Sequence, residues 1–252
     1  MSASLVGSEM CIRDRLLKFA GPLQSWGTSS HFETRHTDFY PSKSAVIGLL
    51  AASLGYRRDE DEKIQKLNEL DFAVRVDQQG NLLRDFHVAQ KYTEKGKFDR
   101  NYVTNRYYLE DAVFVVALSH TDDSFIDIIK GALKNPYFQP FMGRRALPIT
   151  ADFILGETDV NPLESLKSLK WQASLWFMKK SHDKDAISLE VYLDSQLVNK
   201  DVYQLRQDYV RSFSQKGRRF GFRYEVRELI SVQNPHYLNK NTEHNIFESI
   251  GD

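Results

Sequence analysis

The sequence has 252 residues, and its 34 lysines and arginines balance its 34 aspartates and glutamates, so its bulk charge indicates no partner. Any site for a polyanion must therefore come from local clustering. Hydrophobic residues make up 41% of the chain, and no apolar run approaches the roughly 18 residues that a membrane-spanning helix needs. The single cysteine, Cys11, excludes an internal disulfide and a four-cysteine zinc site, and a cytoplasmic setting is expected.

The opening residues differ in character from the rest of the chain. Met1 to Arg15 read MSASLVGSEMCIRDR, in which charged residues interrupt the apolar run that a secretory signal would need. The stretch is similar to translated sequencing-adapter remnants. We therefore expect residues 1–14 to be a non-native or disordered leader, with a short disordered native leader as the alternative.

The next segments predict a strand, a helix and a second strand. Residues 15–20 are a short apolar run that stops at the turn signal Gly21-Pro22, and the following residues to Tyr40 are polar and irregular. From Pro41 to Gly55 apolar residues recur at helical spacing, which predicts a helix. Residues 72–76 alternate as a strand does.

The middle of the chain completes a recognisable order of elements. Residues 81–108 are polar, basic and aromatic without a helical period, which favours a long β-hairpin insertion. The run AVFVVAL at 112–118 predicts a buried central strand, and the apolar spacing over 125–133 predicts an amphipathic helix. This order suits an α+β fold, a ferredoxin-like (RRM-like) domain over residues 15–147 with the insertion as a "thumb".

The second half reads as mostly antiparallel β. The Pro- and Gly-punctuated stretch 136–148 predicts a domain boundary, residues 171–177 are rich in β-forming residues, and residues 187–193 alternate as a half-buried strand. We expect a small antiparallel β domain over residues 148–234, followed by a polar tail over 235–252.

Two loops between the first strand and the first helix could bind a nucleotide. In the loop from Gly21 to Gly27, Trp26 offers a stacking face and Gln24 and Ser25 offer hydrogen bonds. The alternative, favoured by composition alone, is a rigid turn with Trp26 in the core.

The second loop is the start of the predicted helix. Lys43 and Ser44 could seat a phosphate there, because free backbone N–H groups point out of a helix N-terminus. Simple capping of the helix by Ser42, with Lys43 in solvent, is equally compatible with the sequence.

Three further segments concentrate positive charge among aromatic rings, a mixture that suits single-stranded RNA. Residues 84–106 carry six cations, among them Lys91 and Arg100, against three carboxylates; a partner protein covering the rings is the alternative. Arg144-Arg145 follow Gly143 in a geometry suited to phosphate. The span 206–227, which includes Arg218 and Arg219, carries seven cations against two carboxylates.

Catalytic signals are weak. The seven histidines include no pair at helical i, i+4 spacing and no HExxH motif, so the sequence predicts no metal site and no cofactor. His87, near Lys91 and Tyr92, could in principle cleave RNA without a metal by deprotonating a 2′-hydroxyl. A histidine that only hydrogen-bonds RNA or a partner is favoured.

Several of these segments together resemble the CasD family, the fifth CRISPR-associated family in its type I-E Cascade form. The resemblance is carried by residues 16–27, 32–35 and 41–50, by Tyr107-Tyr108-Leu109-Glu110-Asp111-Ala112, by Gly143-Arg144-Arg145 and by Arg218-Arg219-Phe220-Gly221. It extends from about Leu16 to Val226, and the first block is the most specific.

The resemblance implies a ferredoxin-like domain with a protruding β thumb, a small β domain, and a subunit that binds the 5′ handle of CRISPR RNA (crRNA) without cleaving it. It also implies a cap on one end of the Cascade filament, contacts with the backbone subunit (CasC) and the large subunit (CasA), and contact with target DNA only through the complex. In the type I-C branch the homologous protein is the nuclease, which keeps a metal-independent endoribonuclease open as the alternative. The expected RNA-binding residues are Gln24, Ser25, Trp26, Gly27, Lys43, Ser44, His87, Lys91, Arg100, Arg144, Arg145, Arg218 and Arg219.

Overall fold

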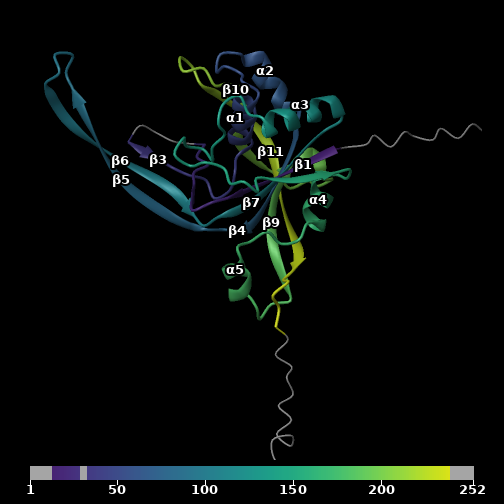
Figure 1. Ribbon diagram of the computed structural model, residues 1–252. Coiled ribbons are helices and arrows are strands. Elements are labelled where there is room, and N and C mark those ends of the chain that lie inside the picture. The colour runs from purple at the N-terminus through teal and green to yellow at the C-terminus, as the bar shows by residue number, and fades with distance from the viewer. Residues whose placement is uncertain (1–12, 29–32, 239–252) are drawn as a thin grey trace, which may run out of the picture.

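The computed structural model describes residues 13–28 and 33–238, and its largest element is a seven-stranded sheet in which all neighbouring strands are antiparallel (Figure 1). The strand order is β10-β11-β9-β4-β7-β1-β8. The bounds are β1 Arg13–Ala20, β4 Asp71–Gln78, β7 Val113–His120, β8 Ile154–Thr158, β9 Ala186–Asp194, β10 Gln204–Ser212 and β11 Arg219–Gln233. The chain is therefore a mixed α+β protein with mostly antiparallel sheets, as the sequence predicted.

Helices α1 (Lys43–Ser53) and α3 (Asp123–Lys134) cover one face of this sheet. Their apolar residues, such as Leu50 and Ile129, pack against Phe72 and Phe114 of the central strands in one buried cluster. The α1 helix begins where the Ser42 hydroxyl accepts a hydrogen bond from the Ala45 N–H, an ordinary N-cap. The short helices α2 (Asp61–Lys66) and η1 (Leu67–Glu69) lie beside β10.

The opposite face of the sheet is covered as well. Leu166 of α4 (Pro162–Ser168) and Trp171 pack against Val115 and Ala117 of β7. The buried Arg75 guanidinium, which pairs with Asp77 at 2.7 Å, donates to backbone carbonyls of residues 166, 169 and 170 and holds this segment on the sheet. Because both faces are covered, the central strands offer no open surface on which bases could stack.

The boundary predicted at residues 147/148 does not separate two sheets. Strands β9, β10 and β11 of the predicted small β domain continue the sheet of the first half, because β9 pairs directly with β4. Residues 171–177, predicted to be β-rich, instead contain the start of helix α5 (Leu175–Lys180). A second short helix, η2, spans Ser195–Leu197. Pairing between strands more than a hundred residues apart leaves no local sequence pattern.

The predicted leader and tail lie largely outside the described residues, at 1–12 and 239–252. Asp14, assigned to the leader from the sequence, is fully buried in β1 and accepts a 2.7 Å hydrogen bond from the Ser165 hydroxyl. Within the described residues no helix has the length and apolar character needed to cross a lipid bilayer.

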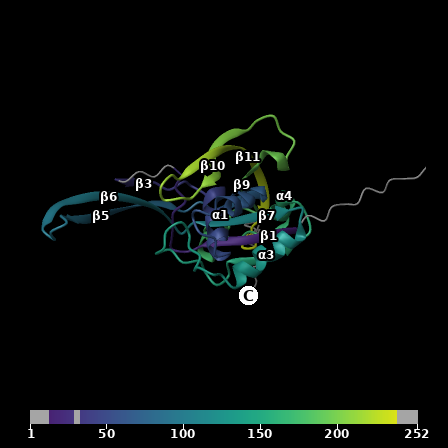
Figure 2. The ribbon, with the colours of Figure 1, turned by 90° about the horizontal axis from the view of Figure 1, so that it is seen from above.

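A smaller sheet extends away from the body of the molecule (Figures 1 and 2). Strands β5 (Asn81–Tyr92) and β6 (Phe98–Glu110) form a long antiparallel hairpin at the position of the predicted insertion. Near its base, β2 (Leu23–Gln24) pairs antiparallel with β6, and β3 (Thr34–Arg35) pairs parallel with it. The loop of residues 21–28 is thereby fastened to the root of the hairpin.

Candidate nucleic-acid interface

Two loops that lie far apart in the sequence are in direct contact at the root of the hairpin. The Ser25 N–H donates to the Met142 carbonyl at 3.3 Å, and a Cβ at Gly143 would lie 1.6 Å from the Ser25 carbonyl oxygen. Gly143 also has a φ of +83°, a conformation that favours glycine. Glycine is therefore required here on two counts, and it brings the Arg144-Arg145 pair beside the loop of residues 21–28.

The two arginines of this pair have different surroundings. The Arg144 guanidinium lies 4.1 Å from the centre of the Tyr108 ring, and its Nη2 donates to the carbonyls of Arg35 and Tyr107 at 3.1 and 2.9 Å. It therefore ties β3 to β6. Arg145 is exposed, and within the described residues it forms no ion pair. Its charge is available to a ligand.

Most of the predicted nucleotide-binding loop points inward instead. Gln24 is fully buried and donates from Nε2 to the carbonyls of Phe19 and Ala112. Trp26, 1% exposed, donates to Gln24 Oε1 at 3.0 Å and meets the Phe19 ring edge-on. These two side chains form the rigid turn that composition alone favoured, and the Ser25 hydroxyl is likewise buried, donating to the Tyr107 carbonyl. Gly27 remains at the surface.

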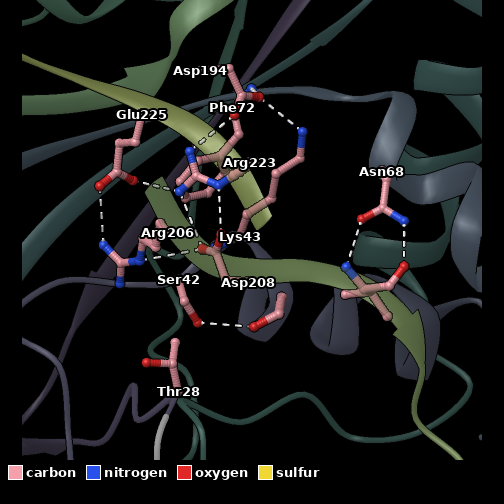
Figure 3. A network of polar contacts seen from close by, with 12 residues as sticks. Thr28, Ser42, Lys43, Asn68, Phe72, Asp194, Arg206, Asp208, Arg223 and Glu225 are labelled. Carbon is pink, nitrogen blue, oxygen red and sulfur yellow. Dashed lines mark hydrogen bonds and ion pairs between the residues drawn. The ribbon is translucent and has the colours of Figure 1, made fainter. Parts of the chain in front are cut away.

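Lys43 also points inward, into a network of buried charges (Figure 3). Its Nζ lies 2.8 Å from Asp194 Oδ2, and its backbone N–H donates to Asp208. Arg223 contacts the same two aspartates and Glu225. Burial alone would lower the pKa of Arg223, but these three carboxylates raise it above its usual range. Lys43 is therefore a structural cation, and its ammonium is not directed at a phosphate site.

The same network reduces the charge available on the basic span 206–227. Arg206 faces Asp38, Asp208 and Glu225, and its guanidinium lies 4.1 Å from the Tyr40 ring. Arg227 pairs with Glu190. The carboxylates at 38, 190 and 194 lie outside the span, so counting charges along it missed them. The exposed cations that remain are Arg211, Lys216, Arg218 and Arg219.

The three arginines among these cations line a cleft of about 720 Å³ between α2 and the β10–β11 hairpin. An adjoining hollow of about 150 Å³ shares Gln207, Arg218 and Phe220 with it. The cleft is lined by Gln65, Gln207, Arg211, Arg218, Arg219 and Phe220, and the hollow adds Gly27, Thr28 and Ser44. The structure thus brings together four of the predicted residues, namely Gly27, Ser44, Arg218 and Arg219.

The cleft also contains residues that sequence reasoning did not single out. Arg211 and Phe220 lay within the basic span but were not distinguished from their neighbours. Gln65 comes from α2, 146 residues before Arg211, and is placed by a 2.8 Å hydrogen bond from its Nε2 to the Arg211 carbonyl. Only the packing of α2 on β10 shows that it belongs to the cleft.

The projecting hairpin has two chemically different faces, because residues paired across its strands lie on the same face. One face, called here the basic face, carries His87, Lys91, Arg100 and Arg106 with Tyr102 and Tyr108. Asp85 lies opposite Arg106 on this face, and Lys91 pairs with Asp99 at 3.3 Å. It leads to Arg144 through the contact with Tyr108. The other, called here the apolar face, exposes Phe86, Val88 and Val103, with Tyr92 and Phe98 near the tip.

The surroundings of His87 are those of a hydrogen-bonding residue. Its Nδ1 lies 3.3 Å from the Thr104 hydroxyl and 3.5 Å from Arg106 Nη2. Tyr92, five residues along the strand, lies on the opposite face and cannot assist it. Among the described residues no group of three or more His, Cys, Asp or Glu side chains is placed to hold a metal ion.

Comparison with known proteins identifies the family of the chain. A family model described as "CRISPR-associated protein (Cas_Cas5)" matches residues 16–224. The chain belongs to this family. It is 37% identical over 155 residues to the CRISPR system Cascade subunit CasD of Escherichia coli (strain K12), which covers 56% of this chain and 69% of that protein.

Two solved structures are similar over most of this Cas5-family chain. One, described as a CRISPR RNA-guided surveillance complex, has a TM-score of 0.73 and 30% identity, covering 91% of this chain and 95% of that one. Another, described as a crystal structure of a Cas protein, has a TM-score of 0.61 and 30% identity, covering 89% and 97%. The range matched by the Cas5 family model contains the hairpin, the turn of residues 143–145 (called here the Arg144 turn) and every residue lining the cleft.

Proposed function

We propose that this Cas5-family protein is a subunit of a type I-E Cascade complex that binds the 5′ handle of crRNA and caps the backbone filament. The observation that carries the proposal is the clustering of exposed cations and rings on one surface of a chain with no net charge. Arginines neutralise phosphates, and rings stack on unpaired bases, so this surface suits single-stranded RNA.

The proposed RNA path starts from three exposed arginines that form no ion pair among the described residues. Arg145, Arg218 and Arg219 would contact phosphates, with Gly27 and Ser44 lining the path between them. The basic face of the hairpin, with His87, Lys91 and Arg100, would extend the path. Gln24, Trp26 and Lys43 are engaged inside the protein, so the proposal gives them the role of holding the loops in place.

The fold assignment within this proposal is ferredoxin-like. Strands β8, β1, β7 and β4 lie in that order in the sheet, with α1 and α3 as the crossovers, which is the arrangement expected of a split βαβ unit. The β5–β6 hairpin would then be the thumb. Its apolar face would pack against neighbouring protein subunits (CasC or CasA), and target DNA would be met only through the assembled complex, in the cytoplasm.

A holding role is preferred to the alternative of metal-independent cleavage. His87 already bonds within the hairpin, and Tyr92 lies on the other face. Incubation of precursor crRNA with the protein in chelator should leave the RNA intact. Cleavage that disappears in His87→Ala would establish the endoribonuclease instead.

The binding proposal is tested with labelled RNAs that carry either the repeat-derived handle or a scrambled handle of the same composition. We expect the full-length protein to bind the handle RNA more tightly at a fixed salt concentration, since base contacts and 2′-hydroxyl contacts add to the phosphate term. Equal affinity for the two RNAs would remove the handle assignment.

A further inference from the structure

The cleft between α2 and the β10–β11 hairpin combines three arginines, an aromatic ring and two side-chain amides. Arg211, Arg218 and Arg219 converge on it, and in the part of the chain that the structure describes none of these three guanidinium groups lies in an ion pair. The Phe220 ring and the amides of Gln65 and Gln207 complete the lining. We infer that this cleft binds a single unstacked nucleotide of the RNA, an inference that rests on the proposed function and deepens it.

Each part of a nucleotide has a counterpart in the cleft. Guanidinium groups contact phosphate oxygens through paired N–H donors, which assigns the arginines to the phosphates. The Phe220 ring offers a face for the base, and primary amides can donate to and accept from a base edge. Gln65 keeps its Oε1 for this purpose, because its protein bond to the Arg211 carbonyl is made by Nε2.

The size and position of the cleft fit one nucleotide in a longer strand. Its volume of about 720 Å³ lies in the range of ordinary ligand pockets. The adjoining hollow, lined by Gly27, Thr28 and Ser44, gives the strand an exit toward the loop that contacts the Arg144 turn. A nucleotide in the cleft would therefore lie on the same path as Arg145.

The walls of the cleft are held in place before any ligand arrives. Asn68 of η1, which directly follows α2, bonds both the N–H and the carbonyl of Val210, at 3.1 and 2.9 Å, and so fixes β10 beside η1. On the other wall, Phe213 meets Phe220 edge-on and lies over Gly48, where a Cβ would be 3.6 Å from its ring. A pre-formed site loses less conformational entropy on binding.

The test combines an abasic scan with protein variants. Handle RNAs lacking one base at a time are bound to the full-length wild type, to Gln207→Ala and to Phe220→Leu. We expect one abasic position to weaken wild-type binding about tenfold and to have little further effect in the variants, since the base and the side chains act as one contact. Gln207→Ala is the safer variant, because Gln207 is exposed whereas Phe220 also packs against Phe213.

The assignment of the arginines to phosphates is tested separately, by the salt dependence of RNA affinity. Arg218→Gln combined with Arg219→Gln should lower the slope of log affinity against log salt by about 1.4, or ~0.7 for each phosphate contact on a single strand. Lys216→Gln is the matched control: it removes one charge from the same loop but does not line the cleft.

The outcomes separate this inference from the proposed function. If the wild type prefers the handle RNA but no abasic position couples to Gln207 or Phe220, the cleft holds no nucleotide and only the inference fails. If coupling is present on handle and scrambled RNA alike, the nucleotide site stands and handle selectivity fails. Variants that bind RNA normally but no longer assemble with other subunits would assign the cleft to an acidic protein surface and overturn the inference.

Discussion

Arg144 and Arg145 are neighbours in sequence, but only Arg144 is engaged by the protein itself. Arg144 bonds two backbone carbonyls and lies over Tyr108, whereas the Arg145 side chain is exposed. We predict that Arg144→Lys destabilises the fold by about 1–2 kcal/mol, since an ammonium cannot reproduce the planar contact and both bonds. Arg145→Gln should leave stability unchanged. Chemical denaturation of the two variants checks this.

For RNA binding we expect the opposite pattern: Arg145→Gln should change the salt dependence of the affinity, and Arg144→Lys should not. Arg145→Gln removes one proposed phosphate contact and should lower the salt slope by ~0.7. Arg144→Lys, measured under conditions where it is folded, should keep the wild-type slope. If Arg145→Gln leaves the slope unchanged, the RNA does not pass this turn.

Arg223 and Arg227 are a second pair of arginines with different surroundings, and both lie on β11. Arg223 is buried among Asp194, Asp208 and Glu225, and removing it would leave these carboxylates without their principal counter-ion. Arg223→Met is expected to cost about 3–5 kcal/mol of folding free energy. Arg227→Met removes an exposed partner of Glu190 and should produce no measurable change. Similar unfolding midpoints for both variants would show that the buried network contributes little.

At the scale of elements, the contact between β1 and α4 should make stability depend on pH. Burial raises the pKa of Asp14 from 3.8 to about 7, although Ser165 donates a hydrogen bond to it. The folded state therefore holds a proton that the unfolded chain releases near pH 4. Stability should fall as the pH rises from about 4 to about 7 and then level off.

Thermal unfolding between pH 4 and pH 8 measures this effect. Asp14→Asn should make the profile less steep over that range; a slope remains, because burial also raises the pKa of Asp38 and of Asp77. The control is Glu157→Gln: hydrogen bonds from Arg15 and Lys130 hold the pKa of Glu157 at about 2 in the folded state, against 4.5 for a free glutamate. This group therefore stabilises the fold above its unfolded pKa, so Glu157→Gln should change the profile only at the acid end of the range and in the direction opposite to Asp14→Asn. An unchanged profile in Asp14→Asn would mean that Asp14 is not protonated in the fold.

The β5–β6 hairpin has no core of its own, so its apolar face is expected to be covered in the assembled complex. Phe86 is 62% exposed and Val88 is 46% exposed, so changing both to serine should alter folding stability by less than about 0.5 kcal/mol per site. Co-purification with the other subunits should fall at least about tenfold. Ala89→Ser, on the basic face, is the control and should assemble normally. Normal assembly of the Phe86/Val88 variant would place the protein contact elsewhere.

At the scale of the whole molecule, the elements were more predictable than their assembly. The apolar run at 112–118 predicted β7, and the apolar spacing at 41–55 and 125–133 predicted α1 and α3, because a buried strand and an amphipathic helix leave local patterns. Pairing of β9 with β4 leaves none, so the second half was assigned to a separate domain.

The same distinction applies to the candidate site. Positive charges on exposed loops, such as those of Arg145 and Arg218, were predicted because charged residue types can be read directly from the sequence. The partners of Lys43 and Arg223 were not, because Asp194 lies far along the chain from Lys43 and is brought to it only by folding. Nothing in the sequence around Gln65 indicated a place in the site, because that place follows only from the packing of α2 against β10.

The central claim is that RNA lies on the surface formed by the 21–28 loop, the Arg144 turn and the β10–β11 cleft. Photo-crosslinking of crRNA carrying 4-thiouridine in its handle, followed by mass spectrometry of the crosslinked peptides, tests it most directly. We predict crosslinks at residues 27–28, 144–145 and 207–220. Helix α5, at the other end of the molecule in Figure 1, exposes Trp176 and serves as an internal control. Handle crosslinks concentrated on α5, with none in the three predicted segments, would contradict the account.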